Sequence, residues 1–78
     1  MASRETLQNF RVRIRNGAAS RMEILLEPWG DSISLAEGEA TVLTVTGPGD
    51  GELEIHREDD HVTILGWPGA VISPSKIP

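Results

Sequence analysis

The chain has 78 residues, no Cys and a net charge of −5, which together exclude several kinds of protein. A chain of this length forms one domain at most and buries only about two-thirds of the surface of its unfolded state. Without Cys, no disulfide or thiolate metal site can stabilise so small a core, so self-association is expected. The longest apolar runs are far shorter than the ~20 residues of a membrane helix. Because residues 1–9 also lack the apolar segment of a signal peptide, a cytoplasmic protein is predicted.

The charges are divided unevenly along the chain. Residues 1–26 hold five Arg and two Glu, a net charge of +3, whereas residues 27–78 hold two basic residues and ten acids, a net charge of −8. One interpretation is that an early strand lies across later ones and the charges pair within a sheet. The other is that the molecule has oppositely charged faces, which meet a partner or another copy electrostatically.

The first predicted strand alternates between apolar residues and arginines. In residues 10–15 the apolar side chains share one face, as in a half-buried strand, and the other face carries Arg11, Arg13 and Arg15. The turn signal Asn16-Gly17 follows. Residues 22–27 alternate again, so we predict an antiparallel hairpin in which their glutamates lie opposite the arginines.

Further short segments have the pattern of strands, and none shows helical spacing over three turns. Residues 41–46 are β-branched at every position but one, which favours a central strand. The remaining predicted strands are residues 32–35, 52–56, 61–65 and 70–73. The pattern predicts an all-β protein, a small antiparallel β-sandwich or barrel of six to seven short strands. Its predicted divisions are a flexible segment at 1–9, the domain at 10–73 and a tail at 74–78.

Each of the two Trp lies beside a Pro and a Gly after an aliphatic run, which predicts that both mark the end of a strand. Trp has the largest apolar surface of any side chain, so both are predicted to belong to the core, with exposure on a ligand-binding rim as the alternative. The complete predicted core is Phe10, Val12, Ile14, Met22, Ile24, Leu26, Trp29, Leu35, Leu43, Val45, Leu53, Ile55, Val62, Ile64 and Trp67.

The Trp, Pro and Gly residues at these strand ends belong to sequence runs that resemble a known family. The runs LEPWGD at 26–31, GE at 38–39, GELE at 51–54 and GWPG at 66–69 resemble a family of small bacterial proteins without an assigned function. The resemblance spans residues 20–72. It implies a bacterial or phage setting and a compact all-β fold, and it supplies no catalytic residues.

One group of side chains has the composition of a metal site, namely His56, His61, Asp59 and Asp60. In a hairpin the two His could lie opposite one another, and two imidazoles with a carboxylate suit a transition metal. A solvated, acidic hairpin tip explains the same pattern, and the chain has no third His. We therefore predict neither a metal site nor a cofactor.

Catalysis and nucleic-acid binding are not expected. The titratable groups fall on predicted turns and outward strand positions, and the loop at 47–51 precedes no helix that could bind phosphate. Single-strand binding uses aromatic platforms, which the arginine strand lacks on its outward side. The sequence therefore predicts a non-catalytic protein-binding or structural module that uses Arg11, Arg13 and Arg15. The alternative is a domain that binds a carbohydrate or small ligand through Trp29 and Trp67.

Overall fold

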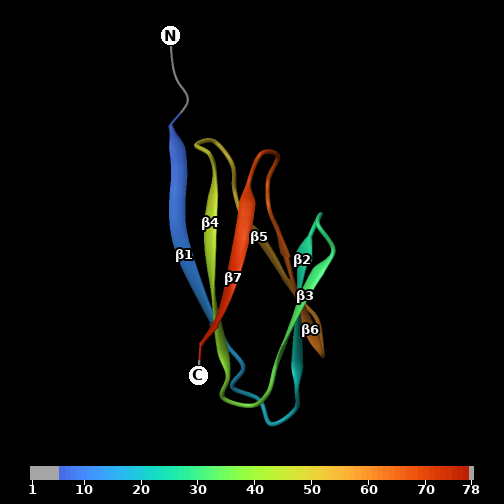
Figure 1. Cartoon of the computed structure of the whole chain (residues 1–78). Helices are drawn as coiled ribbons and strands as arrows, with labels where there is room; N and C mark the ends of the chain where they lie inside the picture. Colours follow the sequence, from blue (N-terminus) through green and yellow to red (C-terminus); the bar gives the residue numbers. More distant parts are fainter. Residues whose placement is uncertain (1–5, 78) are drawn as a thin grey trace.

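The computed structural model describes residues 6–77, in which the chain forms seven strands and no helix (Figure 1). The strands are β1 (Leu7–Arg15), β2 (Met22–Glu27), β3 (Asp31–Leu35), β4 (Ala40–Pro48), β5 (Glu54–Arg57), β6 (His61–Leu65) and β7 (Val71–Ile77). They form two sheets, a small sheet in the order β1-β4-β7 and a large sheet in the order β3-β2-β6-β5. The predicted all-β class is confirmed, and of the two predicted architectures the chain forms the sandwich.

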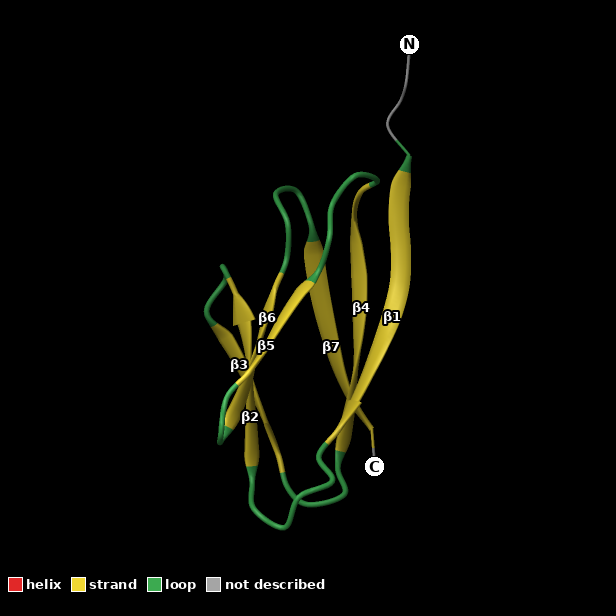
Figure 2. Cartoon of the chain, turned by 180° about the vertical axis from the view of Figure 1, so that it is seen from behind, coloured by secondary structure: helices red, strands yellow, loops and turns green. Residues whose placement is uncertain are grey.

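The core lies between the two sheets (Figure 2). Successive side chains of a strand face opposite sides, so every second residue of the central strands points inward. The fully buried apolar side chains of the cluster come from both sheets and are Ile24, Leu26, Leu35, Leu43, Val45 and Ile64. Burying an aliphatic side chain of this size contributes about 1.5–3 kcal/mol, so these six supply much of the stability of the domain.

The prediction that Trp29 and Ile55 belong to the buried core is wrong. Trp29 is 42% exposed, because it lies in the turn between β2 and β3 rather than between the sheets. Ile55 lies opposite the buried Ile64 and so faces inward, but it is 54% exposed. β5 is the edge of the large sheet and has a neighbouring strand on one side only, so nothing covers the outer flank of Ile55.

The predicted hairpin of residues 10–15 with 22–27 is also wrong. β1 pairs with β4 in the small sheet, whereas β2 belongs to the large sheet. The chain between them therefore crosses from one sheet to the other. This arrangement lets the apolar faces of both strands meet the same core from opposite sides, which a flat hairpin does not.

The large sheet contains one parallel pair, which the prediction of an antiparallel fold did not include. β2 runs parallel to β6, with Leu26 opposite Ile64. The other strand pairs are antiparallel. Because β2 and β6 run in the same direction, both end at the upper end of the sandwich, near the β4–β5 and β6–β7 loops (Figure 1).

The ends of the strands differ from the expected bounds. β1 begins at Leu7, so the last residues of the predicted flexible segment 1–9 belong to a strand, and residues 1–5 lie outside the described part. β7 continues to Ile77, through most of the predicted tail. The predicted strand ends before Trp29 and Trp67 are confirmed, because β2 ends at Glu27 and β6 at Leu65. Residues 6–77 contain no helix long and apolar enough to cross a bilayer.

Candidate functional site

The outer surface of the small sheet, here called the arginine face, collects the three predicted arginines. In the β1–β4 register Arg11 lies opposite Thr44 and Arg13 opposite Val42, and partners in a ladder share a face. The β4–β7 register adds Ser73 opposite Thr44. The outward residues of the three strands are Leu7, Asn9, Arg11, Arg13, Arg15, Ala40, Val42, Thr44, Thr46, Pro48, Val71, Ser73, Ser75 and Ile77. The face is therefore cationic along one edge, and hydroxyl-bearing or apolar elsewhere.

No carboxylate lies among the strand residues of this face. Arg15 donates a hydrogen bond from Nη1 to the carbonyl oxygen of Gly38 at 2.7 Å. Within residues 6–77 neither Arg11 nor Arg13 forms an ion pair. Together with Val42 these two side chains line a depression of about 240 Å³. Three guanidinium groups without a carboxylate partner produce a local positive potential on a protein that is acidic as a whole.

The upper end of the arginine face is apolar. Leu7 lies opposite Pro48, and Val71 opposite the neighbouring Thr46. Leu7 is 64% exposed and Val71 58% exposed, although both belong to strands. Exposed aliphatic side chains next to a charged stripe give the face both an apolar and an electrostatic means of contact.

The outer surface of the large sheet, here called the glutamate face, has the opposite charge. Its strand residues include three carboxylates and no Lys or Arg, and the carboxylates belong to Glu23, Glu27 and Glu54. Arg21 precedes β2 and donates from Nη1 to Oγ of Ser34 at 3.0 Å at the rim of this face. The arginines of β1 and the glutamates of β2 therefore lie on opposite sides of the sandwich. Of the two interpretations of the uneven charge, the geometry agrees with oppositely charged faces.

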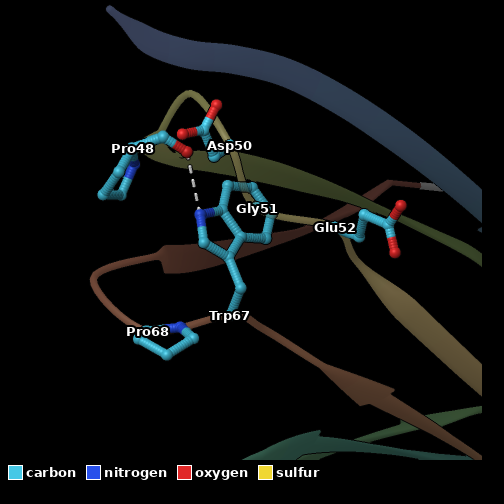
Figure 3. A pocket seen from close by; sticks show the side chains of 6 residues that line it. All are labelled: Pro48, Asp50, Gly51, Glu52, Trp67 and Pro68. Carbon is cyan, nitrogen blue, oxygen red and sulfur yellow. Dashed lines mark hydrogen bonds between the residues drawn. The ribbon is translucent and has the colours of Figure 1, made fainter. Parts of the chain in front are cut away.

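The upper end of the sandwich carries a groove beside Trp67, here called the tryptophan groove (Figure 3). It is shallow and open to solvent, has a volume of about 490 Å³ and is lined by Pro48, Asp50, Gly51, Glu52, Trp67 and Pro68. The indole Nε1 donates to the carbonyl oxygen of Pro48 at 2.9 Å. The ring also lies parallel to that of Phe10, with centroids 6.4 Å apart. Trp67 is thus held rigidly, and its indole N–H already has a partner within the protein.

Trp29 lies at the same end of the molecule but is packed differently. A Cβ placed on Gly66 would lie 2.7 Å from the Trp29 ring, so the indole covers this glycine. A Cβ placed on Gly51 would overlap the ring of Trp67. Each Trp therefore packs against a separate glycine, and Trp29 is not among the residues that line the tryptophan groove.

The predicted metal candidates do not converge. His56 lies opposite Thr63 rather than His61, so the expected pair of facing imidazoles is wrong. The Nε2 atom of His56 is 2.6 Å from a carboxylate oxygen of Glu54, and Nδ1 of His61 is 2.9 Å from one of Asp60. The hydrogen bond with His61 lowers the pKa of Asp60, and a backbone hydrogen bond lowers it further. Within residues 6–77 no group of three or more His, Asp or Glu side chains could hold a metal ion.

At the lower end of the sandwich, the buried side chain of Asn16 connects two loops. The sequence predicted this residue only as part of a turn. Asn16 is 1% exposed, and its side chain donates to the carbonyl oxygens of Ser20 at 2.8 Å and Leu35 at 3.0 Å. Its Oδ1 accepts from the N–H of Ala18 at 3.0 Å. The side chain therefore links the β1–β2 and β3–β4 connections, and no local signal distinguishes it from an ordinary Asn-Gly turn.

The molecule is thus a small β-sandwich with one cationic face, one anionic face and an aromatic groove at one end. Comparison with known proteins gives no match to this chain among family models, curated proteins or solved structures. The resemblance to a family of small bacterial proteins therefore stays a prediction.

Proposed function

We propose that this domain is a non-catalytic protein-binding module that docks an acidic protein surface on its arginine face. The observation that carries the proposal is that Arg11, Arg13 and Arg15 share a face whose strand residues, all within the described part of the chain, include no carboxylate. Charged groups that stabilise a fold are usually paired, whereas an unpaired stripe steers a partner of opposite charge. The exposed Leu7 and Val71 add the apolar contact that a purely electrostatic surface lacks.

A protein partner suits this face better than a nucleic acid. Single strands bind to surfaces that combine basic residues with aromatic platforms. The arginine face has no aromatic side chain among its strand residues, and the net charge of −5 repels a polyanion. The proposal keeps the cytoplasmic setting expected from a chain without Cys.

The proposal is tested by comparing the wild type with a variant that lacks the stripe. The variant combines Arg11→Ser, Arg13→Ser and Arg15→Ser, and the matched control combines Arg21→Ser with Arg57→Ser, which lie outside the face. Proteins retained from a nuclease-treated extract by the immobilised wild type are purified, and their affinities for all three proteins are measured. We expect a purified acidic protein that binds the wild type and the control alike and the variant at least about tenfold more weakly.

Two results would overturn the proposal. In one, no purified protein distinguishes the variant from the wild type. In the other, single-stranded DNA at low salt is retarded by the wild type and not by the variant, which would make the face a nucleic-acid site.

A second candidate function is favoured by the tryptophan groove. An aromatic ring fixed beside two carboxylates can stack a sugar ring and accept its hydroxyl hydrogen bonds. The groove offers Trp67 with Asp50 and Glu52. We expect a bound oligosaccharide to change the fluorescence of wild type and of Trp29→Phe, and to leave Trp67→Phe unchanged; no change across a panel of glycans would remove this function.

A further inference from the structure

We infer that one partner of the β1 edge is a second copy of this chain, which adds its β5 edge to β1. The inference rests on the proposed protein-binding function and names the occupant. β1 and β5 are edge strands of different sheets, so the contact joins the small sheet of one copy to the large sheet of the next. Strand addition of this kind supplies main-chain hydrogen bonds and aligns alternate side chains across the new pair.

β1 is the longest edge strand of the sandwich. It has nine residues, contains no Pro and forms the outer limit of the small sheet (Figure 2). The opposite edge of that sheet, β7, contains Pro74, which cannot donate to an added strand. No strand among residues 6–77 pairs with the outer edge of β1, which therefore offers a long row of backbone groups to an added strand.

The β5 edge of another copy complements β1 in both charge and shape. Glu54 begins β5 and Glu52 precedes it; the two are exposed and two residues apart, matching the spacing of successive arginines on β1. Ile55 faces inward in its own sheet but is 54% exposed, so an added strand would cover it. Pairing of β5 with β1 places the glutamates beside the arginines, and Ile55 beside the apolar inward residues of β1.

The alternative symmetric contacts are disfavoured by charge. Pairing β1 with another β1 would place arginines next to arginines, and pairing β5 with another β5 would bring the Glu54 side chains together. Like charges across a ladder are destabilising. The arginines thus block one edge contact while leaving the edge open to an acidic strand, which selects a head-to-tail contact.

The contact is expected to be weak, and this determines how it is measured. A single short strand pair buries less than the roughly 1,200 Å² of a stable complex. We therefore expect the mass in sedimentation equilibrium to rise with concentration up to about 1 mM at low salt. The rise should shrink at about 0.5 M salt, because screening weakens the paired charges.

Two complementary variants test the pairing of the β1 arginines with the β5 glutamates. Arg11→Glu with Arg13→Glu disables the β1 edge and leaves β5 intact, whereas Glu52→Arg with Glu54→Arg does the reverse. Each alone should be monomeric, because like charges then meet across the contact, and an equimolar mixture should associate again, because every β1–β5 contact between the two variants joins opposite charges. The matched control, Glu23→Arg with Glu27→Arg, changes the same charge on β2 and should associate as the wild type does.

The outcomes separate this inference from the proposed function. A wild type that stays monomeric at every concentration, or a mixture of variants that does not associate, overturns the head-to-tail contact. Folding of each variant is checked by the dispersion of its amide resonances in an NMR spectrum. A variant that unfolds is replaced by the single substitution Arg13→Glu or Glu54→Arg. A monomeric wild type that still binds a purified acidic partner through the arginines leaves the protein-binding function standing, whereas one that binds none removes both.

Discussion

Asn16 shows how one buried polar side chain can hold two loops of a small sandwich. Its amide makes three hydrogen bonds, and its backbone N–H donates to the Glu39 carbonyl oxygen at 2.9 Å. Buried polar groups are tolerated when they are hydrogen-bonded, and they are costly when a partner is removed. The lower end of the sandwich therefore depends on an amide at this position rather than on apolar packing.

We predict that Asn16→Ala lowers the free energy of unfolding by about 2–3 kcal/mol, because it leaves the buried Leu35 carbonyl oxygen without its side-chain partner. Chemical denaturation measures the change. Ser20→Ala is the control, since that side chain is exposed and only its carbonyl is used, and it should change stability by less than about 0.5 kcal/mol. Equal effects of the two substitutions would show that the amide network contributes nothing.

Glu39 gives the same end of the molecule a dependence on pH. Its carboxylate accepts a hydrogen bond from the N–H of Ala36 at 2.7 Å and lies 3.2 Å from Nζ of Lys76. The backbone hydrogen bond first, and Lys76 second, lower the pKa of Glu39 below its ordinary value of 4.5. A carboxyl whose pKa is lowered on folding stabilises the fold above its unfolded pKa, and this contribution is lost as the pH falls through the lowered value.

We therefore predict that Glu39→Gln lowers the melting temperature at pH 7 and has progressively less effect as the pH falls below 4.5. Thermal melts of both proteins between pH 7 and pH 3 measure the difference. A gap that stays constant over this range would contradict the assignment, because the effect would then come from packing rather than from the charge.

At the scale of strands and turns, two glycines at the upper end each contact a tryptophan ring, and the two rings differ in how freely they can move. Gly51 faces the fixed ring of Trp67, whereas Gly66 faces the half-exposed ring of Trp29. Adding a methyl group forces the neighbouring ring to move, and a fixed ring moves less easily. The two positions therefore differ in tolerance, although both lie beside a tryptophan.

We predict that Gly51→Ala destabilises the domain by about 1–3 kcal/mol, because Trp67 would have to leave both Phe10 and the Pro48 carbonyl. Gly66→Ala should cost less, since Trp29 can swing outward. Gly17→Ala meets nothing within 4 Å and serves as the control, with no loss of stability. Denaturation curves with the tryptophan emission maximum as a second readout measure all three; a Gly51 variant as stable as the control would contradict the fixed position of Trp67.

The strands themselves could be predicted from the sequence, but their partners could not. Alternation shows which side chains share a face, and Arg11, Arg13 and Arg15 do share the outward face of β1. It does not show which strand lies alongside, because the apolar faces of β1 and β2 meet the same core whether the two strands pair or oppose each other. The choice depends on contacts across the whole chain.

The same limit applies to the candidate site. The arginines were predicted as a surface, but the absence of carboxylates beside them follows from the pairing of β1 with β4 rather than β2. The tryptophan groove combines residues from two loops far apart in sequence, which no local pattern brings together. Ile55 alternates as a core residue should, and only the edge position of β5 leaves it exposed.

At the scale of the whole molecule, the separation of charge distinguishes a surface made for binding from one made for stability. Arg11, Arg13 and Arg15 lie two residues apart on one side of a strand, and no carboxylate among residues 6–77 forms an ion pair with them, so their guanidinium groups repel one another. Natural proteins often carry such unfavourable features where function requires them. If the stripe serves binding, the fold should be no less stable without it.

We predict that Arg13→Thr leaves the free energy of unfolding unchanged or raises it by about 0.5 kcal/mol at low salt, because it removes the central repulsion and introduces a β-branched residue. The gain should shrink at about 0.5 M salt, where screening already weakens the repulsion. Val12→Thr, on the partly buried inward side of the same strand, is the control and should destabilise by about 1–2 kcal/mol. A loss of more than about 1 kcal/mol for Arg13→Thr would show that the arginine supports the fold, and the charge separation would then require no partner to explain it.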